Sequence, residues 1–79
     1  MPTNVNFLAN FIARNPGCTP ARARRALCAF NEKEYHRGYY CWYFARGNEY
    51  SSKKGMDYGY WTILNGGLHL TTLGHTKMA

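Results

Sequence analysis

The segment Asn-Pro-Gly-Cys-Thr-Pro at positions 15–20 ends one helix and begins another, and no other stretch constrains the fold as strongly. Pro16 cannot continue an interior helical hydrogen-bond ladder, and Gly17 accepts a positive φ. Thr19 offers an N-cap hydroxyl, and Pro20 suits the first helical position. The sequence therefore predicts two short helices joined by a tight connection.

Apolar residues at helical spacing lie on both sides of this break. They are Val5, Leu8, Phe11 and Ile12 before it, and Ala23, Leu27 and Phe30 after it. Such a stripe is typical of a helix that buries one face. We expect helices over 4–15 and 19–30.

The segment 31–47 supports two alternatives. Aromatic residues at every third or fourth position from Tyr35 onward indicate a helix, whereas the aromatic-rich run 39–44 favours a strand. Gly38 would cost a helix about 1 kcal/mol. We expect a helix over about 32–45, with the strand as the alternative.

Turn signals mark the C-terminal third. Ser-Ser-Lys-Lys-Gly at 51–55 predicts a polar, basic loop. Asn65-Gly66 tolerates the two positive φ angles of a type I′ turn. The apolar run 58–64 and the following run 68–71 should therefore pair as an antiparallel hairpin.

Most of the large aromatic residues are needed for the core of so short a chain. These are Phe7, Phe11, Phe30, Trp42, Phe44 and Trp61. Aromatic residues beyond that need also suit a homodimer interface, because interface cores are enriched in them.

Cys18, Cys28 and Cys41 are odd in number and lack Cys-x-x-Cys spacing, so they predict neither a disulfide framework nor a zinc site. We expect free, mostly buried thiols. The N-terminus lacks the features of a secretory leader, and no apolar run approaches the length of a membrane span. These features predict a cytoplasmic protein with no membrane contact.

Motifs that carry catalysis are missing from the sequence. It contains no Gly-x-Ser-x-Gly, no His-Glu-x-x-His and no phosphate-binding glycine loop. His36, His69 and His75 show no standard metal-ligand spacing with the cysteines. A chain of 79 residues leaves no room for a multi-layer enzyme fold. We expect one domain over residues 1–79, not an enzyme, with no metal and no cofactor.

The charge balance favours a polyanionic partner. Ten Lys and Arg against four Asp and Glu give a formal net charge of +6. The first 31 residues hold four arginines and no acidic residue. A basic surface of this kind is typical of nucleic-acid-binding proteins.

Over residues 4–75 the order of these elements resembles a winged helix-turn-helix domain. Two local patterns carry the resemblance: Asn-Pro-Gly-Cys-Thr at 15–19, and Leu-Thr-Thr-Leu-Gly at 70–74. The resemblance implies an α+β fold in which helices come first and an antiparallel β hairpin follows. The alternative fold is two helices packed on a three-stranded antiparallel meander.

The resemblance implies a duplex DNA-binding module. A helix near 32–45 would enter the major groove, which is wide enough for a helix. A basic wing loop would contact the backbone. The candidate nucleic-acid-binding residues are Lys33, His36, Arg37 and Tyr40 on the groove helix, Lys53 and Lys54 on the wing loop, and Arg22, Arg24 and Arg25 as phosphate contacts.

A protein-interaction module is the alternative function. A small adaptor or inhibitor could use the aromatic and basic surface to bind an acidic protein partner. The two functions differ in salt dependence, because duplex binding weakens log-linearly with salt through counterion release, whereas an aromatic-centred protein interface weakens little.

Overall fold

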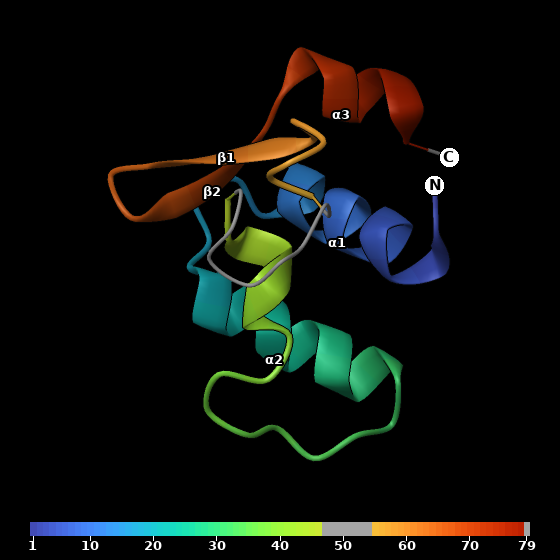
Figure 1. Ribbon diagram of the computed structural model, residues 1–79, viewed down its shortest axis with the longest axis vertical. Coiled ribbons are helices and arrows are strands. Elements are labelled where there is room, and N and C mark those ends of the chain that lie inside the picture. The colour runs from blue at the N-terminus through green and yellow to red at the C-terminus, as the bar shows by residue number, and fades with distance from the viewer. Residues whose placement is uncertain (47–54, 79) are drawn as a thin grey trace.

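The computed structural model describes residues 1–46 and 55–78 (Figure 1). Its elements in chain order are α1 (Thr3–Arg14), α2 (Pro20–Phe30), the 3-10 helix η1 (Cys41–Phe44), β1 (Trp61–Leu64), β2 (Gly67–Leu70) and α3 (Thr72–Lys77). The fold is α+β, and helices precede an antiparallel hairpin, as predicted. No helix of the described ranges is long and apolar enough to cross a bilayer.

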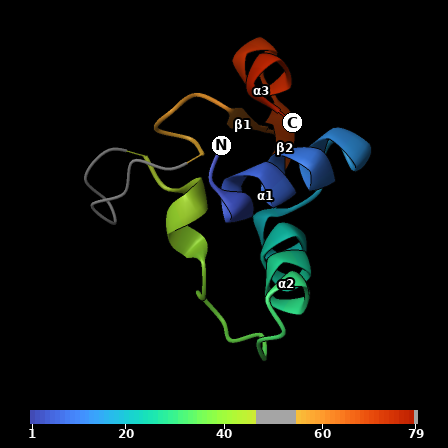
Figure 2. The same cartoon turned by 90° about the vertical axis from the view of Figure 1, so that its right-hand side faces the viewer.

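The two predicted N-terminal helices are confirmed, with α1 and α2 packed against each other (Figure 2). The Thr19 hydroxyl accepts a hydrogen bond from the Arg22 backbone N–H at 3.2 Å, and Pro20 occupies the first turn. Gly17 has φ +84°, which favours glycine. The helices bury Val5, Leu8, Ala9 and Ile12 from α1, and Ala23, Leu27 and Cys28 from α2.

The predicted hairpin is also confirmed. β1 and β2 pair antiparallel in a two-stranded sheet, with Trp61 opposite Leu70 and Leu64 opposite Gly67. Asn65 has φ +52° and Gly66 φ +77°, the pair of positive angles that the Asn-Gly dipeptide predicted. The three-stranded meander, our alternative fold, does not occur among the described residues.

A backbone bridge fixes the hairpin to the helix pair. The Gly17 N–H donates to the Leu68 carbonyl, and the Leu68 N–H donates to the Cys18 carbonyl, both at 2.7 Å. A Cβ at Gly67 would lie 2.6 Å from the Gly17 carbonyl oxygen, so this close approach requires glycine. The connection between α1 and α2 therefore lies along the free edge of β2.

Trp61 occupies the centre of the core. Its side chain is fully buried, and its Nε1 donates to the Tyr43 carbonyl at 3.2 Å. The Phe44 ring lies 5.9 Å from it, centroid to centroid. This residue therefore joins the hairpin to η1, from 18 residues earlier in the chain.

The expected helix over 32–45 is wrong, and so is its alternative, a strand at 39–44. After α2 the chain is irregular until η1, whose single turn covers only Cys41–Phe44. Three residues in this stretch have positive φ: Glu32, Gly38 and Tyr40. A right-handed helix excludes such angles. Burial of aromatic side chains outweighed the local helical pattern.

The helix α3 follows the hairpin and was not predicted. Its N-cap is Thr71, whose hydroxyl accepts from the Gly74 N–H at 3.1 Å and donates to the Gly59 carbonyl. The Thr71 N–H in turn donates to the Tyr60 carbonyl at 3.0 Å. The Leu-Thr-Thr-Leu-Gly pattern at 70–74 is therefore the junction between β2 and α3.

Candidate nucleic-acid interface

The exposed Arg22 lies at the start of α2 and contacts α1 through uncharged groups. Its Nη2 donates to Asn15 Oδ1 at 3.2 Å, and its Cζ lies 5.9 Å from the centroid of the Phe11 ring. Neither partner carries a negative charge. The positive charge of Arg22 is therefore held in place without being neutralised.

Arg24 and Arg25 both contact Tyr35, which comes from the irregular segment after α2. Arg24 Nη2 donates to the Tyr35 hydroxyl at 3.1 Å, and Arg25 Cζ lies 4.3 Å from the centre of its ring. Arg24 is half-buried, and its Nε is buried with no hydrogen-bond partner in the part of the chain that the structure describes. Arg24 thus holds the segment to α2, whereas Arg25 is exposed and open to a phosphate.

Tyr35 was not among the residues that the sequence analysis proposed for the site. The sequence analysis used Tyr35 only as part of the aromatic spacing that indicated a helix over 32–45, and the structure does not contain that helix. The sequence does not predict a contact between Tyr35 and arginines ten and eleven residues earlier, because the chain between them turns at Glu32, a non-glycine residue with positive φ.

Lys33, His36 and Arg37 are all exposed, as expected, but they lie on the irregular segment and not on a groove helix. Tyr40 is a correction: it was expected to face outward, and only 5% of it is exposed. Its hydroxyl accepts a hydrogen bond from Asn31 Nδ2 at 3.0 Å, and burial raises its pKa. Lys53 and Lys54 lie outside the described residues.

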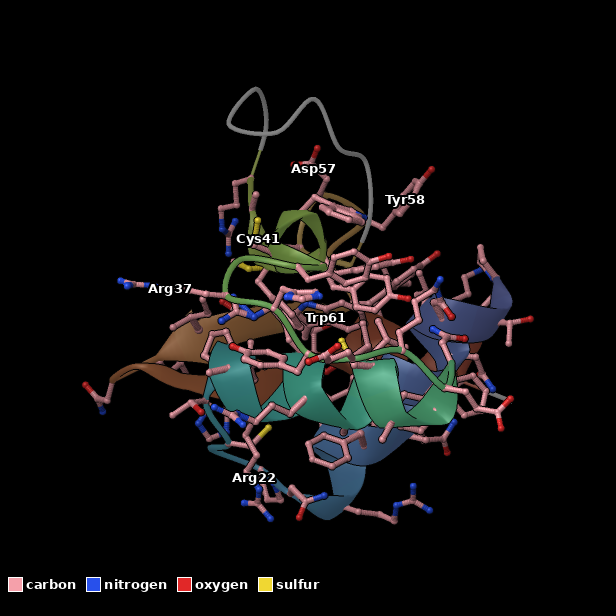
Figure 3. The ribbon with its side chains drawn as sticks, turned by 90° about the horizontal axis from the view of Figure 1, so that it is seen from below. Arg22, Arg37, Cys41, Asp57, Tyr58 and Trp61 are labelled. Carbon is pink, nitrogen blue, oxygen red and sulfur yellow. The ribbon has the colours of Figure 1, made fainter. Side chains whose placement is uncertain are left out.

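The candidate residues do not form one cluster. Figure 3 shows Arg22 and Arg37 on opposite sides of α2. Arg22 lies beside α1, and Arg37 lies on the side of the irregular segment. The expected residues therefore divide into two groups that share α2.

A hollow of about 370 Å³ lies along α1, beside Phe30 at the end of α2. The rings of Phe7 and Phe30 form its apolar wall, stacked 4.4 Å apart at an interplanar angle of 20°. Asn6, Asn10 and Arg14 also line it. Phe30 was expected in the core, but 46% of it is exposed. Phe30 was expected in the core because it follows the buried Leu27 by three positions, and that spacing does not show that α2 ends at Phe30.

Within residues 1–46 and 55–78, no three His, Cys, Asp or Glu side chains form a group that could hold a metal ion. The comparisons found no match for this chain among protein-family models, curated proteins or solved structures. The chemistry of the arginine-rich surface therefore carries the functional argument alone.

Proposed function

We propose that this protein is a duplex DNA-binding module that contacts phosphates with both sides of α2. The observation that carries the proposal is the pairing of its arginines with uncharged groups. Arg22 contacts Asn15 and Phe11, and Arg25 contacts the Tyr35 ring. Guanidinium groups held in this way keep their full charge, and the N–H groups that Arg22 does not use on Asn15 remain as donors for phosphate oxygens.

We expect the contacts to be mainly with the phosphate backbone of the DNA and not with its bases. Lys33, His36 and Arg37 extend from an irregular segment, so no helix carries them into the major groove. Glu32 and Glu34 are exposed beside them and lower the positive potential of that side. The Arg22 side of α2 has no acidic residue near it in sequence, so it should supply the stronger phosphate contact.

A winged-helix-like arrangement remains part of the proposal. Its support is the position of the hairpin, whose strand β2 pairs with the connection between α1 and α2 through Cys18 and Leu68. The turn of this hairpin, Asn65-Gly66, carries no cation. The basic part of the proposed wing would therefore come from Lys53 and Lys54, which precede the hairpin in the sequence.

A salt titration tests the proposal. A fluorescent duplex is titrated with protein between about 50 and 200 mM salt, and the affinity is expected to fall log-linearly. Four phosphate contacts, for example, would give a slope of about −3.6 and a loss of roughly 150-fold over this range. Arg22→Gln and Arg25→Gln should each make the slope shallower by about one.

Lys77→Gln is the matched control, since it removes one exposed charge from α3. Figures 1 and 2 both place α3 on the far side of α1 from α2. If Lys77→Gln changed the slope as much as Arg22→Gln, the contact would be general charge attraction with no defined face. That result would contradict the role proposed for α2.

Exposed apolar side chains favour the protein-interaction alternative. They lie on the hairpin, on the segment before it and on α3: Tyr58 (51% exposed), Ile63 (36%), Leu64 (56%) and Leu73 (43%). Such residues suit a protein interface more than a phosphate backbone. If the protein shows no affinity for a duplex at about 50 mM salt, the protein-interaction module becomes the better proposal. Low salt favours even non-specific DNA binding.

A further inference from the structure

We infer that the hollow between α1 and α2 binds one unpaired nucleobase of a nucleic-acid strand. The inference rests on the proposed function only in taking nucleic acid as the ligand. It concerns the neighbouring hollow, next to the surface that carries Arg22, and a different chemistry, in which an aromatic ring contacts a base.

Phe30 provides a preorganised aromatic platform. One face of its ring is stacked on Phe7 at 4.4 Å, and Phe7 is in turn stacked on Phe11 at 6.3 Å. Although one face is covered, Phe30 is still 46% exposed. A base placed on the remaining surface would extend the stack. The ring is already held by its neighbour, so binding orders little that was free.

The size and polarity of the hollow suit a nucleotide. Its volume is about 370 Å³, which is within the range of small-ligand sites. The side-chain amide of Asn10 donates one hydrogen bond from Nδ2 to the backbone carbonyl of Asn6 at 2.9 Å. This bond does not involve the side-chain oxygen of Asn10, Oδ1. That oxygen can accept a hydrogen bond from a base.

The charge around the hollow fits a strand carrying phosphates. Arg14 lines the hollow, and Arg22 lies at the other end of the aromatic stripe, over Phe11. No acidic residue occurs among the first 31 positions, which supply every residue that lines the hollow. None of the residues that line the hollow is acidic, so a phosphate next to the bound base would meet Arg14. An aromatic platform beside cations is how many proteins hold single strands.

The test compares strands that have the same phosphates with and without bases. Fluorescent oligo-dT of about ten nucleotides, oligo-rU and an abasic strand, all of equal length, are titrated with the protein and with its variants. We expect a base-bearing strand to bind at least about 5-fold tighter than the abasic strand. The tighter of the dT and rU strands identifies the kind of strand that the site prefers.

Phe30→Ala should abolish the preference for a base-bearing strand, and Phe30→Leu, which keeps the apolar bulk, should abolish most of it. Arg14→Gln should weaken every strand but keep the preference. Tyr58→Ala is the control, because Tyr58 is a similarly exposed aromatic residue on another part of the surface. Thermal unfolding checks that each variant is folded.

Equal affinity of wild type for abasic and base-bearing strands would overturn the inference. It would also fall if Tyr58→Ala, and not Phe30→Leu, removed the preference. The same titrations with a duplex keep the two proposals apart. If wild type prefers base-bearing strands and the Phe30 variants lose this preference, the inference is supported even if the protein binds no duplex. If the protein binds a duplex but shows no preference for base-bearing strands, only the proposed function is supported.

Discussion

The hydroxyl of Tyr35 accepts a hydrogen bond from Arg24 Nη2 at 3.1 Å, which ties the irregular segment after α2 back onto that helix. The same ring lies against Arg25 Cζ at 4.3 Å. Two neighbouring arginines of α2 therefore meet one tyrosine. Because Arg24 Nε already lacks a partner within the described ranges, the hydroxyl contributes an important hydrogen bond to a half-buried cation.

Tyr35→Phe should lower the free energy of unfolding by about 1–3 kcal/mol, because it removes a hydrogen-bond acceptor from a partly buried charged group. The ring remains, so the contact with Arg25 is kept. Urea denaturation measures the change. Tyr58→Phe is the control and should stay within about 0.5 kcal/mol, because Tyr58 is half exposed. Equal losses in the two variants would show that the Arg24 bond contributes nothing to stability.

Gly74→Ala should destabilise the protein by about 3 kcal/mol or more, as overpacking against backbone does in severe cases. An added Cβ would lie 2.1 Å from the Tyr60 carbonyl oxygen and 2.9 Å from the Leu70 side chain. Helix propensity alone predicts the opposite sign, since alanine favours helices over glycine. Thermal or urea unfolding decides which effect is larger.

His75→Ala is the matched control for this substitution. It introduces alanine one position further along α3, at an exposed site. We expect a change within about 0.5 kcal/mol. Equal effects of Gly74→Ala and His75→Ala would mean that α3 does not pack on Tyr60 as described.

The parts of the fold that the sequence predicted correctly are those set by local chemistry. The Thr19 cap and Pro20 define the start of α2 within a few residues of chain. The Asn65-Gly66 turn defines the hairpin and its register. Each signal lies next to the structure that it specifies, so no distant contact was needed to interpret it.

The parts that the sequence did not reveal depend on contacts between distant residues. Tyr40 was expected on the outer face of a helix, but its ring is buried and its hydroxyl contacts Asn31. Tyr43 is likewise drawn into the core, where its carbonyl meets Trp61. Helical spacing in the sequence does not show whether such a side chain faces outward on a helix or is buried in an irregular segment. The same aromatic residues fit both arrangements. The sequence did not predict the hollow beside Phe30 for a related reason: the exposure of Phe30 depends on how α1 packs against α2.

Alkaline pH should destabilise the protein partly through Tyr40. Burial raises the pKa of its hydroxyl above the ordinary value of 10.0, and the Asn31 hydrogen bond opposes this only in part. The unfolded chain therefore loses the proton first. The stabilising contribution is complete below pH 10.0 and is lost as the pH rises toward the folded-state pKa.

Tyr40→Phe removes this titration. Below about pH 10 its stability should be lower than that of wild type, because the hydrogen bond with Asn31 is lost. Above about pH 10, however, its stability should decline less steeply than that of wild type. Urea denaturation at a series of pH values measures both effects, with Tyr58→Phe as the control. Identical slopes for wild type and Tyr40→Phe would argue against a buried, protonated Tyr40.

The three thiols should react with a thiol reagent at different rates in the native protein. Cys41 is half-buried, whereas Cys18 and Cys28 are only 5% and 1% exposed. Burial also raises the pKa of the Cys18 thiol, which lowers its thiolate fraction although the Arg22 charge acts in the opposite direction. We expect one faster thiol, abolished by Cys41→Ala, and two that react only as the protein opens. Rapid reaction of all three would contradict this burial.

Arg37→Ala distinguishes backbone contact from base reading. Arg37 was expected to contact a guanine edge from a groove helix, but it extends from an irregular segment on the side of α2 away from Arg22. A bidentate contact with guanine contributes about 1–3 kcal/mol of sequence discrimination. A phosphate contact contributes none, and its loss makes the salt slope shallower by about one.

We expect Arg37→Ala to weaken a selected duplex and a scrambled duplex by the same factor, because without a groove helix the side chain meets phosphates. Titration of each duplex at two salt concentrations measures the affinity ratio and the slope together. Arg37→Lys is the control, because it keeps the charge and the phosphate contact but loses the forked donor pair that guanine requires. If Arg37→Lys retained the affinity for the scrambled duplex but lost it for the selected one, Arg37 would read a base, and the irregular segment would enter the groove when DNA binds.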